Sequence, residues 1–503
     1  MSYNGNARMV CGFIEQHGLW DDEQKARATD LEQQLKAENI RLIRLAWSDS
    51  HGSSRAKEVS VPVFLNSLTE GYNINVATFT LDATGGRVFQ SFIHGGGMGL
   101  EEMTGSPNLT IVPDPLTFRT LPWAPGLGWI LCNEYFDDGT PFHFSSRHLL
   151  NRQINRFRDI NINLVVGLEV EWYLRRIEQE QLTSENSGVP GLRGRPVATS
   201  SVEPGYSYHL ESNFDMMQPI LSELAETYQK LQLPLRSIEN EYGPGQVECT
   251  FDAQPAARAA DDFLLFRTAT RQVCRRHGYL ASFMCKPAIE GYCTNGWHLH
   301  QSLTDAKKGT NLCMTKEKGQ TLSSLAKSYM AGLLENANAS SVFATPTING
   351  YRRFSPNSLA PDRATWGRDH RGTMLRLLGG SEDPATRFEN RLGEPAANPY
   401  LFIASQIAGG LDGIERQAQP WDADDAPYEA ERPMLPTSLN DALDALSNSK
   451  VFRESFGDLY VDYYLSLKHA ELNRFKAYVE DNGDQDAENG ISHWEQNEYF
   501  DFF

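Results

Sequence analysis

The segment from Leu164 to Leu174 constrains the fold more than any other part of the chain. Apolar side chains fill every second position along it, which is typical of a strand with one buried face. Glu169 and Glu171 share the opposite face, where two like charges cost free energy unless a cation or a proton lies between them. Taken alone, the segment also fits an amphipathic strand whose carboxylates point into water.

Two other segments repeat this period of two. His298 and His300 share one face of a predicted strand, and Glu389 shares a face with Arg387 and Arg391. For any one of these residues, a surface charge or a hydrogen-bonded core histidine is the simpler explanation. The joint pattern, with ligating groups on one face of three strands, predicts a site.

The segment Glu241–Glu248 adds two carboxylates on either side of a Gly-Pro-Gly bend. The four segments together supply five glutamates and a histidine, and such oxygen-rich sets favour Mg²⁺ or Mn²⁺ over Zn²⁺. Because so many carboxylates would overload a single ion, we expect two or more ions in each site.

Seven of the arginines between residues 352 and 391 of this acidic chain form a candidate anion-binding group. Guanidinium groups bind carboxylates and phosphates, although these arginines could instead only pair with the glutamates. Metal ions and arginines in one site are typical of phosphoryl transfer from a nucleotide to an oxyanion. The seven are Arg352, Arg353, Arg368, Arg371, Arg376, Arg387 and Arg391.

Helix and strand patterns alternate after residue 147, which predicts a mixed α/β domain. Before it, Asp21 predicts the start of a helix over 23–38, a strand follows at 43–47, and short apolar runs predict a sheet-rich domain at 60–135. Later helices are expected at about 145–158, 212–231, 256–277, 320–338, 398–412, 437–449 and 455–481, and strands near 163–174, 246–251, 297–303, 373–377 and 387–391.

The formal charge of −19 repels polyphosphate backbones and argues against nucleic-acid or anionic-membrane partners. The opening residues lack a signal-peptide pattern, no apolar run is long enough for a membrane span, and the seven cysteines are dispersed. We therefore expect a cytoplasmic protein with free thiols. Residues 480–503 hold eight acids and no Lys or Arg, which predicts a solvated tail.

Several longer stretches, in order along nearly the whole chain, resemble the glutamine synthetase superfamily. They are RLAWSDSHGSSRAKEVSVP, TIVPDPLTFRTLPWAPG, GLEVEWYL, ENEYGPGQVE, HLHQSL, NGYRRFSPNSLAPDRATWGRDHRGTMLR, RFENRLGEPAANPYL and SHWEQNEYF. The resemblance implies an α+β fold, with a helical start and a β-grasp domain over 1–140 and a glutamine synthetase-type catalytic α/β domain over 141–503 that ends in helices. It also implies a homo-oligomer, a dodecamer of two hexameric rings with active sites between subunits.

The resemblance also implies roles for individual residues. One metal ion is assigned to Glu171, Glu241 and Glu248, and a second to Glu169, His298 and Glu389. ATP binding is assigned to His300, Ser302, Arg376 and Arg387, and glutamate binding to Arg353, Arg391 and Gly296. The catalytic assignments are Arg371, which steadies the transferred phosphoryl group, and Asp49, which binds the amine.

The implied reaction is an ATP-dependent ligation. ATP phosphorylates the γ-carboxylate of L-glutamate, and an amine then attacks the γ-glutamyl phosphate to form an amide. Charge is stabilised electrostatically in such a reaction, and no nucleophilic side chain is needed.

The chain departs from ammonia-using members of the family in the flap over the active site. Those members carry a glutamate two residues before the Pro of an Ala-Pro pair, and this chain has Leu359 there. Asp49 still matches the family's other amine-binding aspartate and could orient or deprotonate the nucleophile. Trp297 replaces a methionine before His298. This substitution is either a neutral change in core packing or a change that alters the glutamate loop.

Loss of the flap carboxylate predicts an acceptor larger and more apolar than ammonia. A polyamine would need extra acidic groups for its second cation, whereas a neutral arylamine needs none. The chain resembles most the γ-glutamylanilide synthetases that begin aniline degradation, then alkylamine and polyamine γ-glutamyl ligases, then ammonia-using glutamine synthetases. A structural or sensor homologue without catalysis is the alternative outside enzymes, and it should show gaps among the metal and arginine positions.

Overall fold

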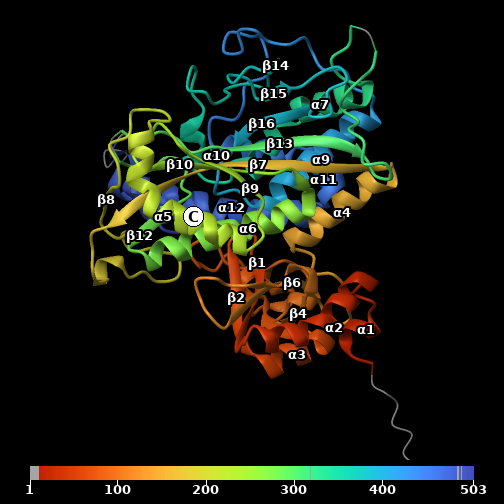
Figure 1. Ribbon diagram of the computed structural model, residues 1–503, viewed down its shortest axis with the longest axis vertical. Helices are drawn as coiled ribbons and strands as arrows, with labels where there is room; N and C mark the ends of the chain where they lie inside the picture. Colours follow the sequence, from red (N-terminus) through yellow and green to blue (C-terminus); the bar gives the residue numbers. More distant parts are fainter. Residues whose placement is uncertain (1–10, 290, 318, 484–486, 489) are drawn as a thin grey trace, which may run out of the picture. The chain divides into compact units, whose positions relative to one another are not determined.

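The computed structural model describes residues 11–289, 291–317, 319–483, 487–488 and 490–503. The chain forms two compact units, coloured red to orange and orange to blue in Figure 1. The first unit holds the residues up to Asp49, Ser54–Phe79 and Phe89–His148. The second holds Ser50–Ser53, Thr80–Val88 and Leu149–Phe503.

The first unit is built on a six-stranded sheet with the order β2-β1-β6-β4-β3 and with β5 paired to β6. Its strands are β1 (Leu42–Ser48), β2 (Ser54–Ser60), β3 (Tyr72–Asn75), β4 (Asn108–Pro113), β5 (Arg119–Thr120) and β6 (Leu127–Tyr135), and its helices are α1 (Phe13–Gln16), α2 (Asp22–Ala37) and α3 (Val61–Glu70). The Asp21 carboxylate caps α2 by accepting a hydrogen bond of 2.8 Å from the backbone N–H of Gln24. The predicted helix and strand are confirmed, whereas α3 was missed because its β-branched and aromatic start favours a strand.

The second unit contains a ten-stranded sheet, and its centre is the sixteen-residue strand β7 (Ile162–Ile177). The main order is β14-β15-β16-β13-β7-β10-β9, and β8, β11 and β12 also pair with β7. The strands are β8 (Thr199–Ser201), β9 (Leu235–Asn240), β10 (Gln246–Phe251), β11 (Gln254–Pro255), β12 (Tyr279–Ser282), β13 (Trp297–Asp305), β14 (Trp366–Arg368), β15 (Leu375–Leu378) and β16 (Arg387–Gly393), with a ribbon of β17 (Ala487–Glu488) and β18 (Ile491–Ser492). The strands predicted in this region are confirmed.

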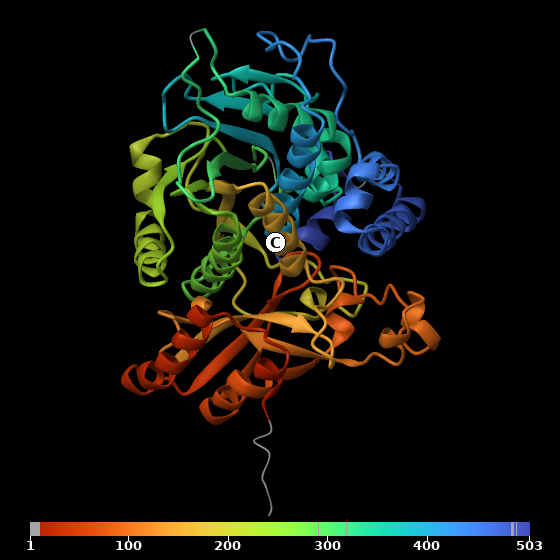
Figure 2. The same cartoon turned by 90° about the vertical axis from the view of Figure 1, so that its right-hand side faces the viewer.

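Helices pack on this sheet and bury its apolar face (Figure 2). The helices from residue 146 onward are α4 (Ser146–Asp159), α5 (Glu211–Lys230), α6 (Ala256–Arg276), α7 (Ser324–Glu335), α8 (Ala337–Ala344), α9 (Pro399–Glu415), α10 (Leu439–Ser447), α11 (Lys450–Phe456), α12 (Asp458–Asn482) and α13 (His493–Tyr499). Helices α5, α6 and α8 contact the strands directly, and α7, α9 and α10 pack on one another or on these helices. The helix predicted at about 320–338 is confirmed as α7, although α7 begins at Ser324 and ends at Glu335, and a separate helix, α8, begins at Ala337.

Trp297 lies in this core, fully buried, and stacks on Phe263 of α6 with ring centroids 4.1 Å apart. Phe402 of α9 meets it edge-on at 5.0 Å. The side chain therefore packs between the sheet and two helices, as its position opposite His298 predicts. No helix among the described residues is both long and apolar enough to cross a bilayer.

The solvated tail predicted for residues 480–503 is wrong for the last helix. Glu495 is 0% exposed and Glu498 is 2% exposed, because α13 packs into the second unit through apolar neighbours. Asp484 and Asp486, which also contributed to that prediction, lie outside the described residues. The acidic end of the chain is thus partly an interior element.

Candidate active site

Glu169 occupies the centre of the site because β13 pairs with β7 so that His298 lies opposite it. Its Oε1 lies 2.5 Å from Nδ1 of His298, and its Oε2 lies 3.0 Å from Nε2 of His300. Burial acts to raise the pKa of Glu169, but the two imidazoles outweigh it and hold that pKa well below its usual range. The groups predicted to share a face therefore do meet.

Three more carboxyl side chains lie close together beside this centre, those of Glu171, Glu241 and Glu248. Strand β10 pairs with β7 so that Glu248 lies opposite Glu171, whose Oε2 accepts a 2.7 Å hydrogen bond from the backbone N–H of Gly296. Burial, and then the charges of Glu169, Glu171 and Glu241, raise the pKa of Glu248 to about 11. Burial and the charge of Glu171 raise the pKa of Glu241 to about 8. Shifts in this direction favour the protonated carboxyls at neutral pH unless a cation balances their charge.

Glu389 lies on the far side of the histidines, opposite His300 across the pairing of β16 with β13. Its carboxylate accepts hydrogen bonds from Arg376, at 2.8 Å, and from Arg391. Burial acts to raise the pKa of Glu389, but the charges of His298 and Arg391 and of its other neighbours hold it below its usual range. The buried Nε of Arg391 has no hydrogen-bond partner in the described part of the chain, so this guanidinium retains a donor for an anion.

Two groups of side chains could hold a metal ion. Ligand atoms of Glu169, Glu248 and His298 lie within 4.8 Å of one another, and so do those of Glu169, His300 and Glu389. Carboxylate oxygens with one imidazole suit a hard divalent cation, and such an ion would displace the protons that the crowded carboxyls otherwise hold. The residues therefore fit the divalent ions of the predicted chemistry, although their division between two ions stays a prediction.

Mg²⁺ binding at pH 7 is expected to release about one to two protons per subunit, because Glu248 and Glu241 hold protons in the metal-free site. Affinity for Mg²⁺ should accordingly rise with pH as these carboxyls, whose pKa values lie above their usual range, ionise. Calorimetric titrations in buffers of different ionisation enthalpy measure the release. Binding with no proton release would contradict this account of the cluster.

Two cavities adjoin the carboxylates. The larger, of about 880 Å³, lies along β7, β13 and β16, and the other, of about 680 Å³, contains the crowded carboxyls. Four residues line both cavities, and they mark the place where the two meet. These residues are Glu169, Thr250, Arg371 and Arg376.

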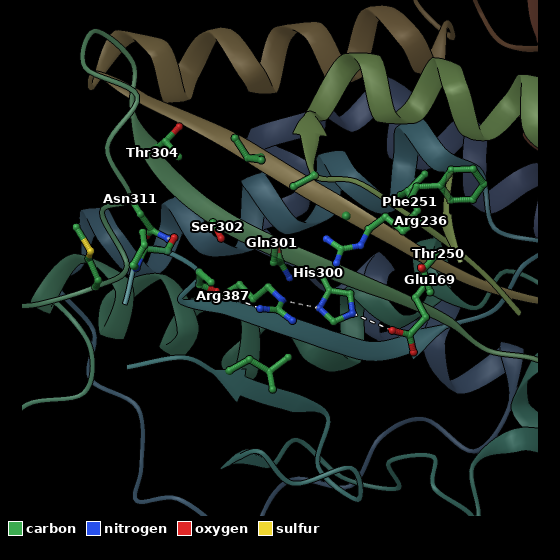
Figure 3. Close-up of a pocket in the computed structure, with 18 of the residues that line it drawn as sticks. Glu169, Arg236, Thr250, Phe251, His300, Gln301, Ser302, Thr304, Asn311 and Arg387 are labelled. Atoms are coloured by element: carbon green, nitrogen blue, oxygen red, sulfur yellow. Dashed lines mark hydrogen bonds and ion pairs between the residues drawn. The ribbon is translucent and has the colours of Figure 1, made fainter. Parts of the chain in front are cut away.

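The larger cavity holds the residues predicted to bind ATP, and Figure 3 shows part of its lining. His300 lies between Glu169 and Arg387, whose Nε is 3.1 Å from Nδ1 of His300. Arg376 reaches the same cavity, while Ser302 lines it and donates a 3.1 Å hydrogen bond to the carbonyl of Thr386. Positive groups thus gather where phosphates would lie.

The smaller cavity is lined by Arg353 and Arg391, two of the three residues predicted to bind glutamate, and the third, Gly296, packs against Arg353. Arg353 is buried and donates a 2.8 Å hydrogen bond to the carbonyl of Arg391, while its Nη2 lies 3.3 Å from Nε2 of His298. A Cβ on Gly296 would lie 2.7 Å from Nη2 of Arg353, so any larger residue there would displace the guanidinium. Gly296 is therefore required by close packing against Arg353 rather than by its backbone conformation.

Leu359 lines the same cavity and is 53% exposed. Its backbone has a φ of 59°, in the left-handed region, and its carbonyl accepts a 3.1 Å hydrogen bond from Nη2 of Arg391. The flap is therefore tied to one of the predicted glutamate-binding arginines.

Two tyrosines that sequence reasoning missed also line this cavity. The rings of Tyr208 and Tyr242 stack with centroids 4.8 Å apart and planes inclined by 10°, and each residue is nearly half exposed. Tyr242 follows Glu241 directly, so its place beside a predicted ligand was a signal in the sequence. Tyr208 lies in a Gly- and Pro-rich loop and carried no such signal.

Asp49 belongs to the first unit, where its carboxylate is 0% exposed and accepts a 2.7 Å hydrogen bond from Nε of Arg55. Arg371, in contrast, lies in the second unit at the meeting of the two cavities. Its side chain is exposed there. The predicted roles of both residues stay predictions.

Comparisons with known proteins agree with this geometry. The family described as glutamine synthetase, catalytic domain, matches residues 143–485. A γ-glutamylanilide synthase of Acinetobacter sp is 42% identical over 495 residues, which cover 97% of this chain and 98% of that protein. A glutamate–isopropylamine ligase of Pseudomonas sp is 29% identical, over 91% of this chain and 97% of that protein.

A solved structure described as apo GmaS without ligand is 26% identical, with a TM-score of 0.74, and the match covers 89% of this chain and 97% of that one. This likeness confirms the predicted glutamine synthetase-type mixed α/β fold. With the catalytic-domain match over residues 143–485, the chain belongs to the glutamine synthetase family.

Proposed function

We propose that this chain, an ATP-dependent glutamate–amine ligase, joins the γ-carboxylate of L-glutamate to an arylamine such as aniline. One observation carries the choice of amine: Leu359 and the stacked pair Tyr208 and Tyr242 line the cavity that also contains the predicted glutamate-binding arginines. The 42% identity to a γ-glutamylanilide synthase supports the same choice.

In this proposal the phosphoryl group is transferred where the two cavities meet. ATP lies in the larger cavity with its phosphates toward His300, Arg376 and Arg387, and glutamate lies in the smaller one. An oxygen of the γ-carboxylate attacks the γ-phosphorus, ADP leaves, and Arg371 stabilises the charge on the transferring group. The amine nitrogen then attacks the γ-carbonyl carbon, phosphate leaves, and the amine loses a proton.

Each cavity contains groups suited to its substrate. Arg353 and the unpartnered Nε of Arg391 would bind the carboxylates of glutamate. Divalent ions, when bound, would neutralise charge on the phosphate oxygens from the side of the predicted ligands. Those ligands are Glu169, Glu171, Glu241, Glu248, His298 and Glu389, with Mg²⁺ or Mn²⁺ as the ions.

The charges of the smaller cavity favour a neutral amine. Glu239 is the one carboxylate among its described lining residues that lies outside the predicted ligand set. It is already engaged, 3.2 Å from Nε2 of His209 and accepting a 2.7 Å hydrogen bond from Ser237. A polyamine would therefore find no spare carboxylate for its second cation, whereas an aromatic ring could contact the exposed parts of the two tyrosine rings.

An alkylamine is the second candidate, because a glutamate–isopropylamine ligase matches nearly the whole chain. Leu359 would suit an isopropyl group as well as a ring. The tyrosine pair distinguishes the two acceptors, because stacking on a tyrosine ring stabilises a bound planar aromatic ring more than a bound branched alkyl group.

Two further features belong to this proposal. We assign the first unit to the β-grasp domain and the complete enzyme to a dodecamer with active sites between subunits. Asp49, held by Arg55, would orient or deprotonate the amine in such a site. The buried pairing supports this role, because it fixes the direction of the carboxylate.

Phosphate release with glutamate, Mg²⁺ and a panel of amines tests the function. We expect kcat/KM for aniline to exceed the values for ammonia, isopropylamine and putrescine. A higher value for isopropylamine would favour the alkylamine function, and a higher value for ammonia would overturn the amine-ligase assignment. Release of no phosphate with any amine would overturn the enzyme assignment itself.

A further inference from the structure

The last helix of the chain ends in the interior of the second unit. The backbone N–H of Phe283 donates a 3.0 Å hydrogen bond to the carbonyl of the terminal residue, Phe503, which is 4% exposed. The C mark accordingly lies over the body of this unit in both Figure 1 and Figure 2. Helix α13 can therefore influence the position of buried segments, and the proposed reaction assigns no role to this helix.

Glu495 is the polar centre of this helix. Its buried carboxylate accepts hydrogen bonds from the backbone N–H and the hydroxyl of Ser492, at 3.0 and 2.9 Å. It also accepts hydrogen bonds from Asn349, at 3.2 Å, and from Nε and Nη2 of Arg352, both at 3.3 Å. One carboxylate thus joins the end of the chain to the segment Asn349–Arg353.

That segment delivers Arg353 to the smaller cavity. Arg353 follows Arg352 directly, in one 3₁₀ turn with Asn349. Tyr499 of α13 adds a second tie to the start of this turn, since its hydroxyl accepts a 3.3 Å hydrogen bond from the backbone N–H of Ile348. The direction of the Arg353 side chain therefore depends on how α13 holds the turn.

The same helix also holds a second wall of that cavity. Asn349 makes two hydrogen bonds to the backbone of Lys286, at 2.7 and 3.0 Å, and Gln496 accepts one of 2.8 Å from the N–H of Ala288. The chain then runs through Cys293 and Thr294, which line the cavity, to Gly296 against Arg353. Helix α13 thus bridges the two segments that face each other around the glutamate position.

We infer that α13 is a positioning element of the smaller cavity, where glutamate is proposed to bind, and that Glu495 is the residue through which α13 fixes the direction of the Arg353 side chain. The inference rests on the proposed function only in taking glutamate as the ligand of Arg353. Loss of the Glu495 charge would let the 348–353 turn shift relative to the segments 286–289 and 291–296. Because a small misplacement weakens a bidentate clamp, glutamate binding should suffer more than ATP binding.

Glu498 provides a matched control in the same helix. It is also buried, and its carboxylate accepts a 2.7 Å hydrogen bond from Arg474 of α12, which pairs in turn with Asp82. None of these three residues is among the described residues lining the two cavities. Glu498→Gln and Glu495→Gln thus remove the same charge from one helix, but only the second removes a tie to the cavity.

The test measures KM for glutamate and for ATP, together with thermal stability, in the full-length chain. We expect Glu495→Gln to raise KM for glutamate about 10-fold while KM for ATP stays within about twofold. Glu498→Gln should lower thermal stability comparably and leave both KM values unchanged. An unchanged KM for glutamate in Glu495→Gln, or an equal rise in Glu498→Gln, would overturn the inference.

Arg352→Gln perturbs the same ion pair from its half-exposed end, in case Glu495→Gln does not fold. It should raise KM for glutamate in the same selective way, and an unselective effect would count against the inference. Failure of the proposed function looks different, because the unaltered enzyme would then show no glutamate-dependent phosphate release at all. That result would remove glutamate as the ligand and overturn the inference with it.

Discussion

Replacing Arg371 by alanine is expected to lower kcat by about 10³-fold or more, the effect typical of an arginine that stabilises a transferring phosphoryl group. Arg371 lines both cavities and belongs to neither substrate's predicted set of binding residues, so KM for ATP and for glutamate should change little. Steady-state kinetics with saturating Mg²⁺ separate the two parameters. A loss confined to kcat indicates an interaction made only in the transition state.

Arg368→Ala is the matched control for this prediction. Arg368 lies at the end of β14, three residues before Arg371, is exposed, and is absent from the described lining of both cavities. Its removal deletes the same charge from the same acidic protein and should leave kcat nearly unchanged. Equal losses in the two variants would show that net charge, rather than position, explains the effect.

Replacing Leu359 by glutamate is expected to raise the preference for ammonia over aniline by about 10- to 100-fold, because a charge-assisted hydrogen bond to ammonium contributes about 1.5–3 kcal/mol. The substitution also removes apolar contact area from an aromatic acceptor. The ratio of the two kcat/KM values measures the change.

Leu359→Gln separates the two causes. Glutamine matches the shape of glutamate, and both would occupy the same left-handed backbone position, so backbone strain is common to the two variants. We expect Leu359→Gln to weaken the use of aniline without improving that of ammonia. An ammonia-to-aniline ratio that stays the same in Leu359→Glu would contradict the explanation of the flap.

The inner part of the site could be predicted from the sequence because strands fix it. A period of two sets which side chains share a face, and antiparallel pairing then brings the faces together, as with Glu169 opposite His298 and Glu248 opposite Glu171. The burial of Trp297 follows from the same alternation. These relations depend on local backbone geometry, which sequence patterns encode well.

The outer part could not be predicted because tertiary contacts decide it. Tyr208 reaches the cavity from a loop with no period, and its stacking on Tyr242 depends on how that loop folds back. The acidic composition of the carboxy terminus favours a tail in water, but the ion pair between the buried Glu495 and the half-exposed Arg352 overrides it. Charge counts alone do not reveal which acids find a partner.

A competition among amines tests the central claim most directly. The enzyme is supplied with ATP, L-glutamate, Mg²⁺ and equal concentrations of aniline, isopropylamine and ammonia. The γ-glutamyl products are then separated, and mass spectrometry identifies and quantifies them. We expect γ-glutamylanilide to be the main product, and we expect replacement of Tyr208 by alanine to lower its share. Glutamine as the main product of the unaltered enzyme would contradict this claim.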